Sequence, residues 1–187
     1  MSLLAIRCLH LDAVWWLVSP QNPLKPKKGM APLKARLATA RAVASHPRLV
    51  ATDIETDLGT VYTAETLIAL RSLFPKLQFI WLMGADNLSQ IDQWEAWEQI
   101  FHTVPIAVFA RPSYSVKALS AKAAHRFQRF RLRERQASRL GYGRLPSWVF
   151  LHTRLHPASA SLIRAAAEHK AGKHKKGREA RFRGRIT

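Results

Sequence analysis

Hydrophobic and polar positions divide the chain into two kinds of segment. Short apolar runs indicate strands, and segments with apolar residues every three or four positions indicate amphipathic helices. Strands are predicted over Val14–Val18, Leu49–Thr52, Gln78–Met83, Ile106–Phe109 and Trp148–Leu151. Helices are predicted over Ser2–Leu9, Pro32–Ser45, Thr63–Leu73, Trp94–His102, Val116–Leu140 and Ser159–His169. Because helix-length segments separate the strands, the pattern predicts a doubly wound, parallel α/β sheet.

The composition is that of one folded domain followed by a basic tail. The chain has 187 residues, of which 48% are hydrophobic, so it can bury a substantial core. We assign the domain to residues 1–168 and a disordered tail to residues 169–187, where apolar periodicity ends. The single cysteine, Cys8, excludes an intrachain disulfide and favours a cytoplasmic location and a packing role. No apolar stretch approaches the roughly 18 residues of a membrane span.

Positive charge is concentrated in the second half of the chain. Residues 1–110 carry a net charge of +1 and residues 111–187 a net charge of +17, within a total of +18. Two readings are open. The basic side chains either form a solvated helix face plus the tail, or they bind a phosphate-bearing partner such as a nucleic acid.

The most informative motif is Gly84-Ala85-Asp86, which directly follows an apolar strand. In an open parallel sheet, ligands bind where strands end and the next helices begin. A glycine allows a ligand to approach the backbone closely, and a carboxylate can accept hydrogen bonds from ribose hydroxyls. The motif therefore predicts a nucleotide site at this strand end.

Other strand ends carry residues suited to anions or aromatic rings. Lys25 lies in a proline-rich loop after the first strand and could contact phosphate, and Arg111 follows the strand Ile106–Phe109. Thr63 is predicted to cap its helix, which would leave a corner for an anion. Trp94 and Trp97 are three residues apart, so we expect them on one helix face, either both in the core, which is the more common outcome, or one in the core and one stacked on a flat ligand.

The segment after the last strand combines helix-capping hydroxyls with an arginine. Ser159 and Ser161 lie at the start of a predicted helix, and Arg164 follows one turn later. Hydroxyl groups, free backbone N–H groups and a guanidinium could converge on a polyphosphate. Such a group suits nucleotidyl transfer, in which catalysis is mainly positioning and charge stabilisation.

In order and spacing these motifs resemble those of bacterial nicotinate mononucleotide adenylyltransferases, in the nucleotidyltransferase superfamily. The resemblance extends from about residue 2 to residue 168. It rests on the Val14–Lys25 strand and loop, Tyr62-Thr63-Ala64-Glu65-Thr66-Leu67, Gly84-Ala85-Asp86, Trp94, and Ala158–Arg164. Glu65 stands where the family has aspartate.

The resemblance implies a transferase that moves AMP from ATP to nicotinate mononucleotide with Mg²⁺, a step of NAD biosynthesis in the cytoplasm. It implies that Tyr62, Thr63 and Trp94 hold the nicotinate. It also implies that Gly84, Asp86 and Ser159 bind the nucleotide, and that phosphates face Lys25, Arg111, Ser161 and Arg164. The expected binding partners are then ATP and nicotinate mononucleotide, and no membrane association is expected.

One departure from the family is the lack of its His-x-Gly-His motif, which binds the ATP phosphates. Met1 aligns within the first helix, just past where that motif would end. We therefore expect either that the start codon is assigned too far downstream or that the protein is truly truncated. In both cases we expect impaired activity and strand edges that lack a partner strand. The alternatives are another adenylyltransferase, such as one acting on phosphopantetheine, and a non-catalytic nucleic-acid-binding protein. Tyr62, Thr63 and Trp94 favour the nicotinate enzyme over the phosphopantetheine one.

Overall fold

The computed structural model describes residues 1–20, 30–112 and 114–152. These residues lie in one compact unit, Met1–Thr153, and a second unit begins at Arg154. The helix expected over Ser159–His169 falls outside the described residues. No helix in the described part of the chain is both long enough and apolar enough to cross a membrane.

The strands are short, and every pair of them is parallel. Strands β1 (Val14–Leu17) and β2 (Leu49–Thr52) form one sheet, and the other strands form a second sheet in the order β3-β4-β6-β5. The second sheet contains β3 (Trp81–Gly84), β4 (Ile106–Phe109), β5 (Arg131–Leu132) and β6 (Trp148–Leu151). Parallel pairing with helices between the strands confirms the predicted α/β class.

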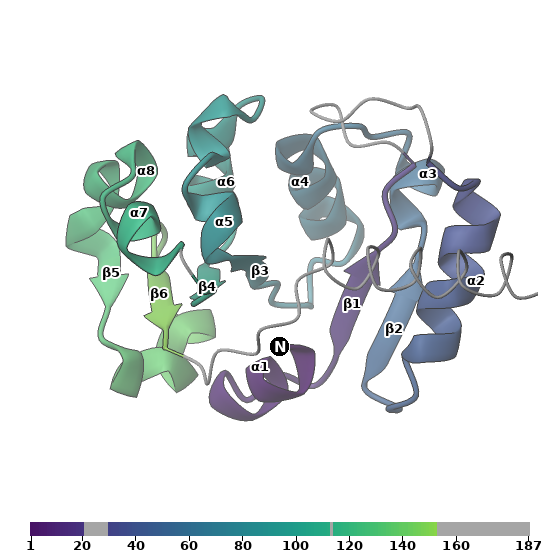
Figure 1. The fold of residues 1–187 in the computed structure, drawn as a ribbon, viewed down its shortest axis with the longest axis horizontal. Coiled ribbons are helices and arrows are strands. Elements are labelled where there is room, and N and C mark those ends of the chain that lie inside the picture. Colours follow the sequence, from purple (N-terminus) through teal and green to yellow (C-terminus); the bar gives the residue numbers. More distant parts are fainter. Residues whose placement is uncertain (21–29, 113, 153–187) are drawn as a thin grey trace, which may run out of the picture. The chain divides into compact units, whose positions relative to one another are not determined.

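Helix α1 precedes β1, and the other helices connect successive strands, as Figure 1 shows. The α-helices are α1 (Ser2–Cys8), α2 (Leu33–Val43), α3 (Ile54–Leu58), α4 (Thr63–Leu73), α5 (Ala85–Leu88), α6 (Trp97–Thr103), α7 (Ser115–Leu119) and α8 (Lys122–Arg126). Three further segments are 3₁₀-helical, namely η1 (Ile91–Gln93), η2 (Gln128–Phe130) and η3 (Glu134–Tyr142).

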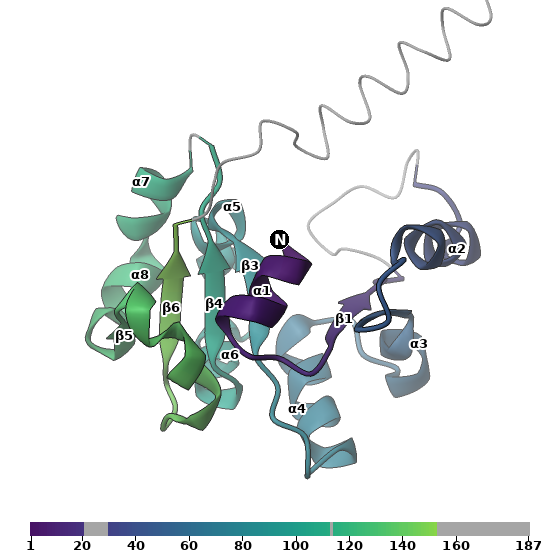
Figure 2. The same cartoon turned by 90° about the horizontal axis from the view of Figure 1, so that it is seen from below.

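The four-stranded sheet is covered on both faces, which is what doubly wound means. Side chains of β4 alternate between two clusters, with Ile106 and Val108 in the larger and Ala107 and Phe109 in the smaller. The larger cluster includes residues of α4, α5, α6, α7 and α8, and the smaller includes residues of α1 and η3. Figure 2 shows α1 and α6 beside the same sheet. Because β4 and β6 are covered on both sides, they are wholly buried and read as continuous apolar runs.

Strand β1 of the first sheet and strand β3 of the second sheet each have one edge that pairs with no other described strand. Among the described strands, β1 pairs only with β2, and β3 pairs only with β4. Side chains nevertheless connect the two parts of the unit. The ring of Trp15 in β1 meets those of Phe74 and Phe79 edge-on at centroid distances of 5.5 and 5.7 Å. Trp16 donates a hydrogen bond of 3.0 Å from its indole N–H to the Ser2 hydroxyl in α1.

Most predicted elements are present, and the exceptions have local reasons. The basic segment predicted as one helix over Val116–Leu140 is wrong, because it is divided into α7, α8, η2, β5 and η3. Ala118 in α7, Ala123 in α8 and Phe127 after α8 are buried in the same hydrophobic cluster, but they reach it from separate short elements and not along one helix face. Helix α3 was not predicted. It is a single turn that ends at Gly59, whose φ of 64° is left-handed.

Candidate functional site

The carboxyl ends of β3 and β4 bring Gly84, Asp86 and Arg111 together. Gly84 ends β3, Asp86 lies in the first turn of α5, and Arg111 follows β4 by two residues. The Arg111 Nε atom is 3.1 Å from Asp86 Oδ1. Oδ1 has no aligned hydrogen bond, so the two groups form an ion pair without hydrogen-bond geometry. Both side chains are part-exposed, by 40% for Arg111 and 30% for Asp86, and a ligand can therefore reach them.

Gly84 is required by this ion pair. A Cβ atom at position 84 would lie 2.3 Å from Asp86 Oδ1 and 2.4 Å from Arg111 Nε. Both distances are below any real Cβ contact, so a side chain would push the two charged groups apart. The backbone at Gly84 has φ of −83°, and the need for glycine is therefore one of space and not of conformation.

The first turn of α4 carries the residues of the Tyr62-Thr63 motif. Thr63 is the first helical residue and Tyr62 precedes the helix, so the prediction that Thr63 is the N-cap is wrong. The Tyr62 N–H instead donates to Glu65 Oε2 at 3.4 Å, which is the reciprocal half of a capping box. The Tyr62 side chain is 38% exposed, and Thr63 is half-buried. Tyr62 can therefore contact a ligand.

A buried carboxyl, Glu55, lies beneath this turn, and the sequence interpretation did not identify it. Glu55 belongs to α3 and is 7% exposed. Thr66 Oγ1 lies 3.5 Å from Glu55 Oε1, and the Ser19 side chain also hydrogen-bonds the carboxyl. Burial raises the pKa of Glu55, and these hydrogen bonds offset the rise in part. The signal in the sequence that could have identified Glu55 is its position shortly after the end of a predicted strand, Leu49–Thr52.

Arg36 in α2 binds three backbone carbonyls, two before and one after the segment 21–29. Its Nη1 donates to the Ser19 carbonyl at 2.8 Å and its Nη2 to the Pro20 carbonyl at 3.0 Å. Its Nε donates to the Ala31 carbonyl at 3.0 Å. One guanidinium therefore holds residues 19, 20 and 31 together, which only the tertiary structure reveals.

The two tryptophans do not share a helix face, so that prediction is wrong. Trp94 is an extended residue after η1, Ala96 has a left-handed φ of 49°, and Trp97 begins α6. Trp97 packs edge-on against Phe101 and Phe127 at centroid distances of 6.2 and 6.0 Å, and so has a core role. Trp94 is half-buried, and its indole N–H is buried without a hydrogen-bond partner among the described residues.

Several residues of the predicted site fall outside the described part of the chain. They are Lys25, Ser159, Ser161 and Arg164. Their roles stay predictions.

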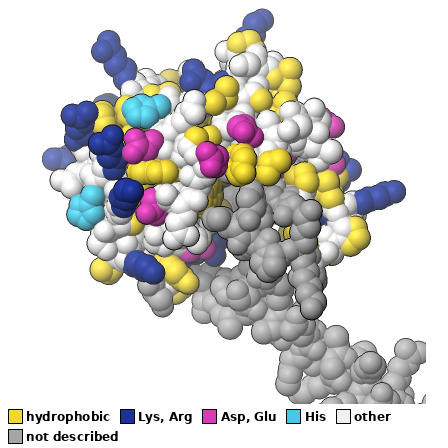
Figure 3. All heavy atoms as spheres, turned by 90° about the horizontal axis from the view of Figure 1, so that it is seen from above, with side chains coloured by type: hydrophobic (Ala, Val, Ile, Leu, Met, Phe, Trp, Pro, Cys, Tyr) yellow, Lys and Arg dark blue, Asp and Glu magenta, His cyan; other side chains and the backbone are white. Residues whose placement is uncertain are grey.

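The basic side chains of residues 114–152 form an exposed surface in which several charges already have partners. Dark-blue side chains stand along the left side of Figure 3, over the part of the fold that carries α7, α8 and β5. The Arg131 guanidinium lies over Trp148 and Phe150, at 5.4 and 5.6 Å, and Arg129 lies over Phe130 at 4.6 Å. Arg126 pairs with Glu98 at 3.4 Å. These contacts match the reading of a solvated face that covers apolar groups.

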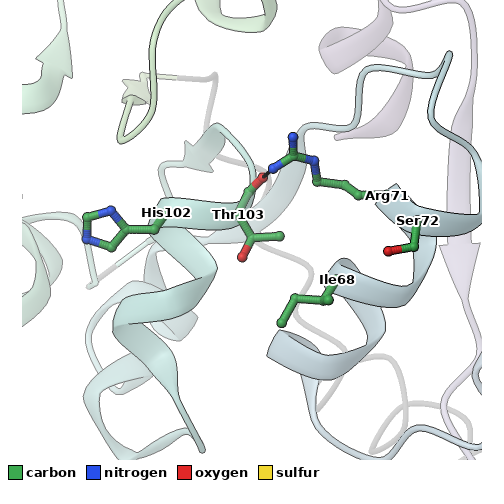
Figure 4. Close-up of a pocket in the computed structure, with 5 residues that line it drawn as sticks. All are labelled: Ile68, Arg71, Ser72, His102 and Thr103. Carbon is green, nitrogen blue, oxygen red and sulfur yellow. Dashed lines mark hydrogen bonds between the residues drawn. The ribbon is translucent and has the colours of Figure 1, made fainter.

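A hollow of about 330 Å³ lies between α4 and α6, away from the strand ends. Figure 4 shows its lining residues, with the Arg71 guanidinium donating to the Thr103 carbonyl at 2.8 Å. None of the predicted site residues lines this hollow. The hollow is open to solvent, and we place the site at the strand ends instead.

The described residues contain no cluster of three or more histidine, cysteine, aspartate or glutamate side chains that could hold a metal ion. Asp86, which follows the end of β3, is already paired with Arg111.

Comparisons with known proteins gave matches over most of the chain. The chain matches the model of a family described as cytidylyltransferase-like over residues 3–166. It is 49% identical over 164 residues to a protein of Cereibacter sphaeroides (strain ATCC 17025 / ATH 2.4.3), covering 88% of this chain and 86% of that protein. It is 47% identical to a Roseobacter denitrificans protein, covering 86% and 80% of the two chains, and 43% identical to a Ruegeria pomeroyi protein, covering 92% and 81%. All three relatives are named "Probable nicotinate-nucleotide adenylyltransferase".

Proposed function

The chain belongs to the cytidylyltransferase-like family, and from that membership we propose that it transfers the adenylyl group of ATP to nicotinate mononucleotide. The observation that carries this proposal is the 43–49% identity, over most of both chains, to three proteins named for this activity. The ion pair at the ends of β3 and β4 supports it, because that is where an open parallel sheet binds nucleotides. The product would be nicotinate adenine dinucleotide, a precursor of NAD.

In this reaction a phosphate oxygen of the mononucleotide attacks the α-phosphorus of ATP. A new phosphoanhydride bond forms, the bond between the α-phosphorus and the β-phosphate oxygen breaks, and pyrophosphate leaves with the electron pair. No covalent enzyme intermediate is needed, so the protein acts by holding the two substrates in line and by balancing charge.

We assign the nucleotide to the ends of β3 and β4. Gly84 leaves the room that the Asp86–Arg111 pair occupies at the nucleotide site, and Asp86 accepts hydrogen bonds from ribose hydroxyls. Arg111 holds Asp86 in place and adds positive charge beside the phosphates, consistent with its 3.1 Å separation from that carboxylate.

We assign the nicotinate ring to Tyr62, Thr63 and Trp94. Tyr62 and Thr63 belong to the start of α4, where free backbone N–H groups favour a carboxylate. Trp94 offers an indole ring for stacking. Lys25, Ser159, Ser161 and Arg164 complete the proposed site from segments outside the described residues.

We propose Mg²⁺ as the divalent ion, bound as the ATP complex and so as part of the co-substrate. Such an ion neutralises phosphate charge. We also propose a cytoplasmic location, which is consistent with a chain whose single cysteine excludes an intrachain disulfide.

The test is an adenylyl-transfer assay on the full chain with ATP, Mg²⁺ and nicotinate mononucleotide, in which pyrophosphate and the dinucleotide are both measured. Nicotinamide mononucleotide and phosphopantetheine serve as competing acceptors. We expect the two products in equal amounts with the nicotinate acceptor. Preferred transfer to phosphopantetheine, or no binding of either nucleotide by calorimetry, would overturn the proposal.

A matched pair of substitutions tests the site itself. Asp86→Asn keeps the size of the side chain but removes its charge, and Asp92→Asn removes a charge from η1 nearby. We expect Asp86→Asn to weaken ATP binding by about tenfold, and Asp92→Asn to leave it unchanged. Equal effects of the two substitutions would remove Asp86 from the site.

A further inference from the structure

Glu55 is a buried carboxyl that the proposed reaction does not use. It is 7% exposed, and its Oε2 atom has no hydrogen-bond partner among the described residues. No lysine, arginine or histidine side chain in the described residues forms an ion pair with it. Burying an unpaired carboxyl has a cost in stability, so an apolar residue of the same size would pack with less penalty. The carboxyl therefore calls for an explanation beyond packing.

The contacts of Glu55 connect three segments that are separate in the sequence. Its carboxyl is hydrogen-bonded by the side chain of Ser19, in the segment that follows β1. It also lies 3.5 Å from the hydroxyl of Thr66, in the first turns of α4. Its own carbonyl accepts a hydrogen bond of 3.1 Å from the Thr60 N–H. Glu55 thus contacts the segment after β1 through Ser19, the loop before α4 through Thr60, and α4 itself through Thr66.

Thr66 carries this connection to the first turn of α4. It is fully buried, and its hydroxyl lies 2.8 Å from the Thr60 hydroxyl. The same hydroxyl lies 3.2 Å from the carbonyl of Tyr62. The position of Thr66 relative to Glu55 therefore determines where Tyr62 and Thr63 lie relative to Ser19.

We propose that Glu55 is a positioning residue, which holds the segment after β1 and the first turn of α4 at the separation that the mononucleotide requires. This inference rests on the proposed function, because it assigns Tyr62 and Thr63 to the nicotinate. A carboxyl suits the role because one carboxyl oxygen has two lone pairs and can accept hydrogen bonds from two hydroxyl groups, those of Ser19 and Thr66. An apolar side chain fills the volume but holds neither donor.

The nucleotide half of the site depends on other residues. Gly84, Asp86 and Arg111 are held by β3, β4 and α5, and no hydrogen bond or ion pair among the described residues joins them to Glu55. Loss of the carboxyl should therefore affect the two substrates unequally. A merely structural residue would affect both substrates together, through the fraction of folded protein.

The experiment uses three variants of the full chain. Glu55→Leu keeps the volume and removes both acceptors, and Glu55→Gln keeps one acceptor. Asp57→Asn removes a charge from the exposed side of α3 and is the matched control. Binding of nicotinate mononucleotide and of ATP is measured separately by calorimetry, and amide hydrogen exchange is followed by mass spectrometry.

We expect Glu55→Leu to weaken mononucleotide binding by about tenfold and to change ATP binding by less than about twofold. Glu55→Gln should recover most of the mononucleotide affinity, and Asp57→Asn should match the natural protein. Peptides covering 60–67 should exchange about tenfold faster in Glu55→Leu, with β4 unchanged. Mononucleotide binding by Glu55→Leu equal to that of the natural protein would overturn the inference, as would equal losses for both substrates.

Failure of the proposed function gives a different result. If the natural protein itself binds no nicotinate mononucleotide, the proposed function fails and hydrogen exchange decides the structural claim. Unchanged exchange over 60–67 in Glu55→Leu would then show that Glu55 positions nothing.

Discussion

The Arg111 guanidinium and the Asp86 carboxylate lie 3.1 Å apart, and the space they occupy is the space that a side chain at Gly84 would fill. Three residues from two strand ends thus depend on one another. The pair has no aligned hydrogen bond that would fix its geometry. Its position therefore depends on the absence of a side chain at Gly84.

Replacing Gly84 by alanine should therefore separate Asp86 from Arg111. We expect ATP binding to weaken by about tenfold or more, and the free energy of unfolding to fall by about 1–3 kcal/mol from overpacking. Calorimetry and urea denaturation measure the two effects. The control is Gly143→Ala, whose added Cβ atom would have its nearest neighbours 3.9 Å away. If both variants bind ATP as the natural protein does, the arrangement at Gly84 is unimportant for binding.

The two tryptophans should respond differently to truncation. Trp97 packs against Phe101 and Phe127, so Trp97→Ala should lower the free energy of unfolding by about 2–4 kcal/mol. Trp94→Ala should weaken binding of nicotinate mononucleotide far more than binding of ATP. Denaturation and calorimetry on both variants check this. Equal losses of both ligands in Trp94→Ala would exclude Trp94 from the nicotinate site.

Arg36 should stabilise the protein through its three carbonyl partners. Arg36→Ala leaves the carbonyls of Ser19, Pro20 and Ala31 without this donor, and two of the three hydrogen bonds are solvent-exposed. We therefore expect a loss of about 1–2 kcal/mol in the free energy of unfolding, less than three buried bonds would give. Arg41→Ala, which loses one contact of 3.5 Å to the Ala51 carbonyl, is the control and should be close to neutral. A loss no larger than that of Arg41→Ala would show that the three bonds add nothing.

The raised pKa of Glu55 predicts a specific dependence of stability on pH. In the folded protein the carboxyl holds its proton to a higher pH than in the unfolded chain, where its pKa is about 4.5. The contribution of Glu55 is therefore greatest below pH 4.5 and is lost as pH rises through the raised pKa. Glu55→Gln removes this titration, so the difference in unfolding free energy between Glu55→Gln and the natural protein should shift in favour of the variant as pH rises.

Denaturation of both proteins at several pH values above and below 4.5 measures that difference. Asp57→Asn, on the same helix but exposed, should show no such trend. A difference that does not change with pH, or that changes in the opposite direction, would contradict the assignment of a raised pKa.

Much of the fold was predictable from local pattern. The buried runs Ile106–Phe109 and Trp148–Leu151 and the helix Thr63–Leu73 have the predicted bounds, because each pairs a clear apolar period with a clear end signal. The basic region was not predictable in this way. Its many charged residues obscure the burial of Ala118, Ala123 and Phe127, which come from separate short elements and pack into one cluster with residues of the sheet.

The class of fold, the strand end that carries Gly84 and Asp86, and the family resemblance that the comparisons confirmed could all be inferred from the amino-acid order. They follow from periodicity and from short motifs, which are local in the chain. The folded arrangement was needed to show that Arg111 pairs with Asp86, that Arg36 joins residues 19, 20 and 31, and that Glu55 contacts Ser19 and Thr66. Each of these contacts joins segments that only folding brings together, and no pattern within one segment specifies its partner in another.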